Sequence, residues 1–155
     1  MYYFAYGSNI DLGQVSKRLE KIIRKITPSE VMKDSVRGWK LVFNKRTNDN
    51  PEKKGYANII EDANEIVEGV LYEITEEEMK ELDRYEGCPE HYERMKIEVT
   101  WDTGKKVIAE TYIARKDKIG TGLLPTKEYL NRLLNAKPFL SPEYYERLKS
   151  QQTLD

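Results

Sequence analysis

The stretch YFAYGSN, Tyr3–Asn9, lies close to the start of the chain and determines its first secondary structure. Its aromatic residues favour a strand, and Gly7, Ser8 and Asn9 then supply turn and helix-capping chemistry. In the segment that follows, DLGQVSKRLEKII, apolar residues recur at helical spacing, namely Leu12, Val15, Leu19, Ile22 and Ile23. The sequence therefore predicts a strand, a tight turn and a helix over residues 2–23.

The predicted turn can also be interpreted as a binding site. Amides around Gly7 to Ile10 would point out of the turn as unpaired donors, beside a helix N-terminus with partial positive charge. Such a place suits a carboxylate or a developing oxyanion. The alternative is ordinary turn and capping chemistry, which the same residues would also supply.

Composition points to one globular domain. A chain of 155 residues with 39% hydrophobic content can bury roughly 70% of its unfolded surface. We expect a single domain over residues 1–150 and a short C-terminal tail over residues 151–155. The 26 Lys and Arg residues are balanced by 27 Asp and Glu residues and form no basic stripe, which argues against a nucleic-acid partner.

The chain shows no signal peptide and no apolar run near the ~20 residues of a membrane span. We therefore expect a cytoplasmic protein with no membrane partner. The single cysteine, Cys88, excludes an intrachain disulfide and a cysteine-rich zinc site. The residues favour neither a monomer nor a homodimer.

The remaining patterns predict an α+β domain. Extended structure is expected over residues 29–46, broken at Gly38, and strands over residues 56–60 and 65–74. Strict alternation of Met95, Ile97, Val99 and Trp101 predicts a hairpin of residues 92–101 with 105–114. Two helices follow, capped by Thr126 and by Ser141. Six or so strands with three or four helices indicate a small, mainly antiparallel β-barrel with flanking helices.

The segment TEEEMKELDRYEG, residues 75–87, carries the strongest local signal. Thr75 and Glu78 have the spacing of a capping box, and Gly87 suits the C-terminal cap. On a helical wheel, Glu86 falls on the same apolar face as Met79 and Leu82. Burial there would raise the pKa of this carboxyl from about 4.3 toward the range useful for proton transfer. Alternatively, the helix ends one residue earlier and Glu86 faces solvent.

Three nearby residues could also carry chemistry. Asp83 borders the face of Glu86 and could share a proton or a metal with it, or it could bond local backbone. Cys88 and His91, the only histidine, could form a thiolate–imidazole dyad or half of a metal site. Because Pro89 lies between Cys88 and His91, a simple turn is the alternative.

Taken together, YFAYGSN and LDRYEG resemble the gamma-glutamylcyclotransferase-like superfamily, over nearly the whole chain. The resemblance implies a small mixed β-barrel, a binding loop of Tyr6, Gly7, Ser8 and Asn9, and a catalytic glutamate at Glu86. Tyr92 and Tyr129 match the positions of pocket tyrosines in that family. Ile10, which follows the loop where many members carry Leu, is expected to belong to the substrate-binding residues as well.

The resemblance implies cyclisation of a γ-glutamyl group to 5-oxoproline, with release of an amine or amino acid and no cofactor or metal. The partner would be a small γ-glutamyl compound: a γ-glutamyl amino acid, glutathione, a γ-glutamyl amine or a biosynthetic intermediate. Two rival hypotheses are a non-catalytic member that only binds such a metabolite, and a cysteine enzyme built on Cys88 and His91.

Overall fold

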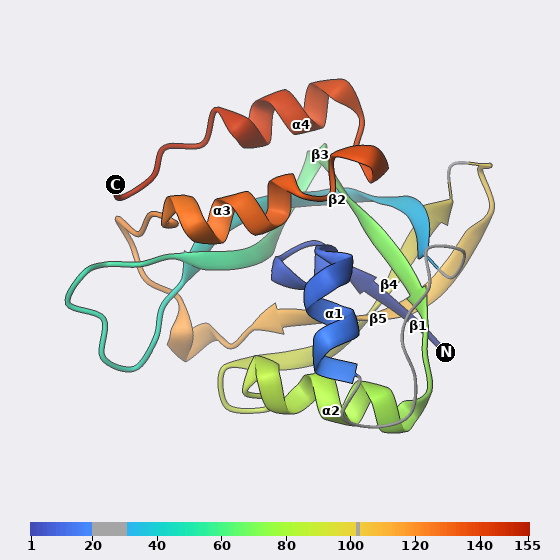
Figure 1. Cartoon of the computed structure of the whole chain (residues 1–155), viewed down its shortest axis with the longest axis horizontal. Helices are drawn as coiled ribbons and strands as arrows, with labels where there is room; N and C mark the ends of the chain where they lie inside the picture. Colours follow the sequence, from blue (N-terminus) through green and yellow to red (C-terminus); the bar gives the residue numbers. More distant parts are fainter. Residues whose placement is uncertain (20–30, 102) are drawn as a thin grey trace.

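The computed structural model describes residues 1–19, 31–101 and 103–155, and within them five strands close into a barrel (Figure 1). The strands are β1 (Tyr2–Ala5), β2 (Val31–Lys45), β3 (Tyr56–Glu73), β4 (Tyr92–Trp101) and β5 (Lys106–Ala114). Their order around the barrel is β1-β3-β2-β4-β5. Neighbours pair antiparallel except β1 and β5, which meet in parallel with Tyr3 opposite Glu110. The predicted barrel is confirmed.

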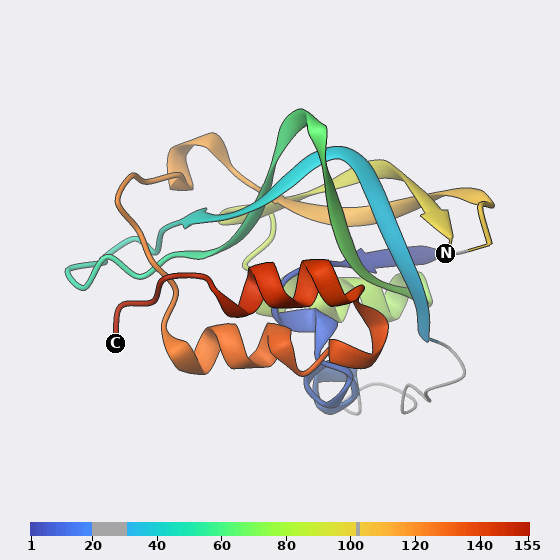
Figure 2. The ribbon, with the colours of Figure 1, turned by 90° about the horizontal axis from the view of Figure 1, so that it is seen from above.

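Four α-helices within the described residues flank this barrel. They are α1 (Leu12–Leu19), α2 (Glu76–Glu86), α3 (Lys127–Leu134) and α4 (Pro142–Lys149), with short 3-10 turns η1 (Ser8–Ile10), η3 (Lys116–Lys118) and η4 (Lys137–Phe139). Both ribbon views show α3 and α4 side by side, covering one side of the barrel while the strands form the other (Figure 2). The capping side chains of Thr126 and Ser141 accept the expected amide hydrogen bonds.

Two strands are longer than the sequence predicted. β2 does not break at Gly38; the residue takes a φ of +85° at an irregularity in the register, and the strand continues beyond it. Residues 56–60 and 65–74 form the single strand β3 down to Glu73, not two strands. A glycine with positive φ inserts a bulge and bends a strand while its pairing resumes on both sides. Of the predicted first helix, the part beyond Leu19 lies outside the described residues.

The helix α2 forms as its local sequence predicts. Thr75 Oγ1 accepts from the Glu78 amide at 3.1 Å, and Glu78 Oε1 accepts from the Thr75 amide at 2.9 Å, which completes the capping box. Met79 and Leu82 are fully buried against the core. Gly87 then adopts a left-handed conformation and ends the helix, so that Glu86 is its last residue.

The ends of the chain are joined to the body by hydrogen bonds. Thr111 Oγ1 donates to the Phe4 carbonyl at 2.8 Å, which ties β1 to β5. In residues 151–155, the Leu154 amide donates to the Pro125 carbonyl at 3.0 Å, and Asp155 Oδ1 accepts from the Lys127 amide at 2.9 Å. The predicted tail therefore lies along the start of α3.

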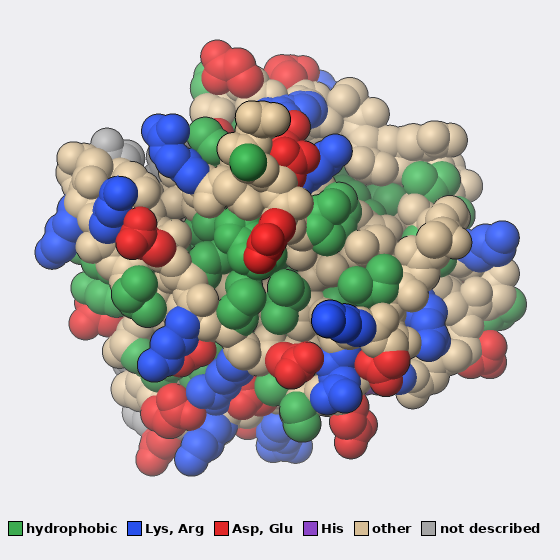
Figure 3. Space-filling view, turned by 180° about the vertical axis from the view of Figure 1, so that it is seen from behind, with side chains coloured by type: hydrophobic (Ala, Val, Ile, Leu, Met, Phe, Trp, Pro, Cys, Tyr) green, Lys and Arg blue, Asp and Glu red, His purple; other side chains and the backbone are tan. Residues whose placement is uncertain are grey.

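The surface carries mixed charge. On the face shown in Figure 3, Lys and Arg side chains are interspersed with Asp and Glu side chains, as their near-equal numbers of 26 and 27 lead one to expect. Within the described ranges, no helix is both long enough and apolar enough to cross a lipid bilayer.

Substituting Gly87 with Ala should destabilise the fold by more than backbone strain alone. An added Cβ would lie 2.8 Å from Cδ2 of His91, in addition to the cost of about 1–2 kcal/mol for an L-residue at a φ of +62°. Gly122→Ala is the matched control, because its φ is +67° and nothing lies within 4 Å of the added Cβ. Urea unfolding should show a larger loss of unfolding free energy for Gly87→Ala than for Gly122→Ala. Equal losses would show that the contact with His91 adds no cost.

Candidate active site

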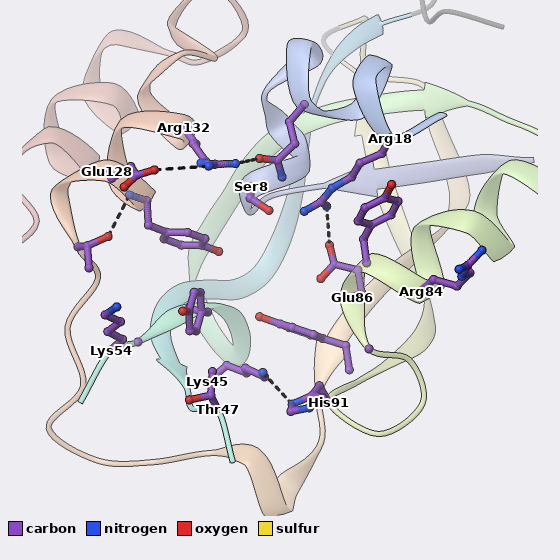
Figure 4. Close-up of a pocket in the computed structure, with 18 of the residues that line it drawn as sticks. Ser8, Arg18, Lys45, Thr47, Lys54, Arg84, Glu86, His91, Glu128 and Arg132 are labelled. Atoms are coloured by element: carbon purple, nitrogen blue, oxygen red, sulfur yellow. Dashed lines mark hydrogen bonds and ion pairs between the residues drawn. The ribbon is translucent and has the colours of Figure 1, made fainter. Parts of the chain in front are cut away.

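A cavity of about 680 Å³ lies between α1, the C-terminal end of α2 and the start of α3 (Figure 4). The end of β2 and the start of β3 also line it. A smaller recess of about 30 Å³, large enough to hold a water molecule, lies beside it. We call these the main cavity and the inner recess. Both are lined by Ser8, Glu86, Tyr92 and Tyr129, and the recess also by Tyr3, Tyr6, Gly7, Asn9, Ala57 and Tyr112.

Glu86 points into the main cavity with a side chain that is only 16% exposed. Its Oε1 accepts a hydrogen bond from Asn9 Nδ2 at 3.0 Å and lies 3.7 Å from the Arg18 guanidinium. Its Oε2 has no hydrogen bond to any residue that the structure describes. One oxygen is therefore held in place while the other is left for a ligand.

The pKa of Glu86 is raised from 4.5 to about 7, chiefly by burial. Arg18 and Lys45 oppose this shift because their positive charges favour the carboxylate, and Asp83 adds to it slightly. A carboxyl group with a pKa near neutral pH can both accept and return a proton, which is what general acid–base catalysis needs.

The loop between β1 and α1 is fixed from several sides. Asn9 donates to Tyr3 Oη at 3.0 Å as well as to Glu86, and its Oδ1 accepts from Arg18 at 2.6 Å. Tyr72 Oη donates to the Asn9 carbonyl at 2.8 Å. Asn9 is thus 2% exposed and bridges α1, the loop and the end of α2.

The loop amides differ in their availability. The Ile10 amide donates to the Gly7 carbonyl at 2.9 Å, so it is not the free donor that the sequence predicted. The Ile10 side chain is buried in the core and lines neither cavity. Among the described residues, the amides of Ser8 and Asn9 donate none of the loop and turn hydrogen bonds, as expected because the first amides of a helical turn have no partner within it. Two donors therefore remain at the recess.

Three tyrosines form rigid walls of the recess. Tyr6 Oη donates to the Tyr112 carbonyl at 2.5 Å, Tyr92 Oη donates to the Ala57 carbonyl at 2.7 Å, and Tyr129 Oη accepts from the Ala57 amide at 3.1 Å. Burial is the largest cause that raises the pKa of each phenol. These hydroxyls stay protonated and are engaged with backbone, so they shape the site.

Asp83 has a structural role in this geometry. Its two oxygens accept from Arg94 Nε at 2.9 Å and from a terminal Arg94 nitrogen at 2.7 Å, and Oδ1 also accepts from Tyr112 Oη at 2.7 Å. These bonds anchor α2 to β4 and β5. In the part of the chain that the structure describes, no group of three or more His, Cys, Asp and Glu side chains is arranged to hold a metal ion.

The Cys88 and His91 pair gains no support from the geometry. The pKa of the half-buried Cys88 thiol is raised, first of all by burial, whereas an activated thiol needs a lowered pKa. His91 Nδ1 lies 3.0 Å from Lys45 Nζ and accepts its hydrogen bond. The histidine is therefore engaged with a lysine on β2.

Sequence reasoning missed Arg18 and Lys45. Arg18 lies three residues after the buried Val15 and next to the buried Leu19, so a charge at the border of an apolar stripe was the available signal. No comparable pattern pointed to Lys45. The site that results is a cavity with a largely buried carboxyl, that of Glu86, at its inner end.

Comparison with known proteins identifies the family. A family model described as "Gamma-glutamyl cyclotransferase, AIG2-like" matches residues 3–131. A protein of Methanocaldococcus jannaschii described as "Putative gamma-glutamylcyclotransferase" is 38% identical over 63 residues, which cover 37% of this chain and 52% of that protein. The match therefore spans about half the length of that relative. The chain belongs to the gamma-glutamyl cyclotransferase, AIG2-like family.

Solved structures share the fold. A gamma-glutamyl cyclotransferase superposes with a TM-score of 0.81 at 23% identity, covering 99% of this chain and 88% of that chain. An uncharacterized human protein gives a TM-score of 0.81 at 22% identity, covering 98% and 88%. At such identities the likeness shows the barrel architecture alone.

Burial of Glu86 should make stability depend on pH. Because its pKa is about 7 in the folded state and ordinarily 4.5, the stability it contributes is complete below about pH 4.5 and lost as pH rises through about 7. The side chain of Glu86→Gln cannot ionise, so this variant does not lose stability in this way. The unfolding free energy of Glu86→Gln minus that of the wild type should therefore rise by about 3 kcal/mol between about pH 4 and pH 8. Denaturant unfolding across this range measures the difference.

The control for this measurement is Glu77→Gln, which removes an exposed carboxylate from the same helix. This variant measures how much of any change comes from losing a negative charge on the surface of the helix. Parallel curves for wild type and Glu86→Gln would show that Glu86 ionises normally in the folded protein.

Proposed function

We propose that this chain is a gamma-glutamylcyclotransferase that converts the γ-glutamyl group of a small molecule to 5-oxoproline, with Glu86 as the general acid and base. The observation that carries this proposal is the Glu86 carboxyl, 16% exposed and with a pKa raised to about 7, beside the loop of Tyr6 to Asn9. Membership in the family supports the reaction class.

In the proposed reaction Glu86 carries protons from the attacking nitrogen to the leaving nitrogen. Ionised Glu86 takes a proton from the α-ammonium of the γ-glutamyl group, and the freed amine attacks the γ-carbonyl carbon. Glu86 gives this proton to the nitrogen of the scissile amide as that bond breaks, and then takes the second proton that the attacking nitrogen must lose and passes it to the released amine. One C–N bond forms, one breaks, and the products are 5-oxoproline and the released amine as its ammonium ion, so no water or redox partner is consumed.

The loop would stabilise the charge that develops. As the amine attacks, the γ-carbonyl oxygen becomes an oxyanion, and preorganised donors at such a position contribute strongly to catalysis. The unbonded amides of Ser8 and Asn9 at the inner recess suit this role. The recess volume of about 30 Å³ is enough for one such oxygen.

The fixed surroundings of Glu86 favour an intramolecular attack. Asn9 and Arg18 hold Oε1, and Tyr92 and Tyr129 are tied to the backbone of Ala57. Rigid walls would bend the γ-glutamyl chain and bring its amine toward its own carbonyl, which lowers the entropic part of the barrier.

Replacing Glu86 with Gln should reduce kcat by about 10²–10⁴-fold, because the amide keeps the shape of the side chain and cannot accept a proton. Release of 5-oxoproline from a panel of γ-glutamyl amino acids, γ-glutamyl amines and glutathione measures this loss. Glu77→Gln, on the exposed face of the same helix, is the matched control and should turn over at the wild-type rate.

This assay also separates the enzyme from its rival, a non-catalytic member that binds a γ-glutamyl metabolite. Turnover by the wild type that disappears in Glu86→Gln supports the enzyme. Binding of several compounds in a thermal-shift screen, with no 5-oxoproline released from any, would instead favour the binding protein.

The pH dependence of kcat/KM should report the ionisation of Glu86. The carboxylate must be ionised to accept the proton, so kcat/KM should fall about tenfold per pH unit below about pH 7. Arg18→Met should move this acid limb to higher pH, since Arg18 is the largest influence that lowers the pKa of Glu86. Arg84→Met removes an exposed arginine at the cavity and should leave the limb in place. If the fall of kcat/KM at low pH stays at the same pH in Arg18→Met, it reports the ionisation of a group other than Glu86.

A further inference from the structure

Lys45 is a charged side chain in the wall of the main cavity that the proposed proton transfer does not use. It is the last residue of β2 and only 6% exposed, yet it lines the main cavity. Figure 4 shows it across the cavity from Glu86, beside His91. It does not line the inner recess.

The direct partners of Lys45 carry no counter-charge, and Glu86, whose negative charge acts on it from further away, is not within ion-pair distance. Its Nζ donates to His91 Nδ1 at 3.0 Å and lies 5.7 Å and 5.4 Å from the ring centres of Tyr56 and Tyr92. The pKa of His91 is lowered, first by burial and then by Lys45, so the imidazole accepts this bond as a neutral ring. None of these groups carries a negative charge.

The other basic side chains of the cavity differ from Lys45 in this respect. Each lies within 4 Å of a carboxylate, in the pairs Arg18–Glu86 at 3.7 Å, Lys54–Glu52 at 3.2 Å, Arg84–Glu81 at 3.4 Å and Arg132–Glu128 at 3.7 Å. Among the described residues, Lys45 has no ion pair of this kind. It is therefore the cavity cation best placed to take an anion from outside the protein.

Burying an ammonium group without a counter-charge is unfavourable. Burial lowers the pKa of Lys45 from 10.5 to about 8, which still leaves it mostly charged at neutral pH. Of its three N–H donors, one is used by His91. An apolar residue would fill the same space without this penalty, so the lysine is better explained by a ligand that completes its coordination.

We propose that Lys45 determines substrate specificity by binding a carboxylate on the amine that the reaction releases, so that the preferred substrates are γ-glutamyl amino acids over γ-glutamyl amines. This inference rests on the proposed cyclotransferase function. It goes beyond that function because it assigns the far end of the main cavity to the leaving group.

The geometry distinguishes this carboxylate from that of the γ-glutamyl group itself. In the proposed reaction the α-amine meets Glu86, and the glutamyl α-carboxylate is bonded to the same carbon as that amine. It would therefore lie near Arg18, which is 3.7 Å from Glu86. Lys45 is not within ion-pair distance of Glu86 and lines only the main cavity, where the released part of the substrate would extend.

The test compares γ-glutamyl-L-alanine with γ-glutamylethylamide, which differ only by the carboxylate of the released amine. We expect the wild type to prefer the alanine compound by about 10- to 100-fold in kcat/KM, the range for a hydrogen bond to a charged group. Lys45→Met should reduce this ratio to near one. Because the substitution removes a buried charge, the melting temperature at neutral pH should not fall, which separates specificity from misfolding.

Lys54→Met is the matched control, since it removes a lysine of the same cavity that is 40% exposed and paired with Glu52. Its substrate ratio should equal that of the wild type. An equal loss on both substrates in Lys45→Met would overturn the proposal, because Lys45 would then hold the glutamyl part. A ratio lowered as much by Lys54→Met would overturn it too, because the cavity would then act through its general positive potential.

If the wild type turns over neither compound, the proposed reaction is wrong. The role of Lys45 is then tested by measuring binding instead of turnover. Calorimetry then compares the Kd of the two compounds for Glu86→Gln and for the double variant Glu86→Gln, Lys45→Met. Tighter binding of the alanine compound that is lost in the double variant supports the role of Lys45. Equal binding of both compounds to Glu86→Gln overturns it.

Discussion

The short strand β1 closes the barrel, and the site depends on that closure. β1 pairs antiparallel with β3 along its whole length and meets β5 in parallel at Tyr3, where the Thr111 hydroxyl also bonds the Phe4 carbonyl. The chain therefore leaves β1 at a fixed point and direction. The loop that follows brings Asn9 within 3.0 Å of a carboxylate 77 residues further along the chain. The closure of the barrel at β1 thus places the loop, and with it the inner recess, beside Glu86.

Charges in the cavity are arranged so that two of them lack a full partner inside the protein. Glu86 is desolvated and receives only one neutral hydrogen bond and a cation at 3.7 Å, while Lys45 is desolvated and bonded to a neutral imidazole. Burial shifts both pKa values toward neutrality, one upward and one downward. Structures tolerate such groups at sites where a ligand supplies the missing interaction. A substrate with an ammonium group at one end and a carboxylate at the other would complement both.

The local patterns in the sequence were sufficient to predict the helix that carries Glu86. The capping box of Thr75 and Glu78, the apolar spacing of Met79 and Leu82, and Gly87 as the stop signal each act within a few residues. The alternation of β4 was likewise reliable at Ile97 and Val99, which are buried. These elements form where the sequence places them because their signals do not depend on distant partners.

What could not be predicted depends on contacts between distant segments. Gly38 was expected to break a strand, but pairing with β3 on both sides carries the strand through it. Ile10 was expected at the binding loop, yet its amide closes the 3-10 turn and its side chain enters the core. The place of Lys45 depends on how the long strand β2 bends around the barrel, which no local pattern encodes.

The two carboxylates at the end of α2, Asp83 and Glu86, each lie near an arginine but differ in how that arginine contacts them. Asp83 receives two direct bonds from Arg94, and that geometry locks the helix to the barrel. Glu86 lies near Arg18, but the guanidinium donates to Asn9 at 2.6 Å, and Asn9 in turn donates to Glu86. The arginine thus orients the carboxylate through a neutral amide. A guanidinium bonded directly to Glu86 would favour the ionised form and, in the proposed reaction, oppose the return of the proton, whereas the intervening amide fixes the position of Oε1 and leaves the pKa near 7.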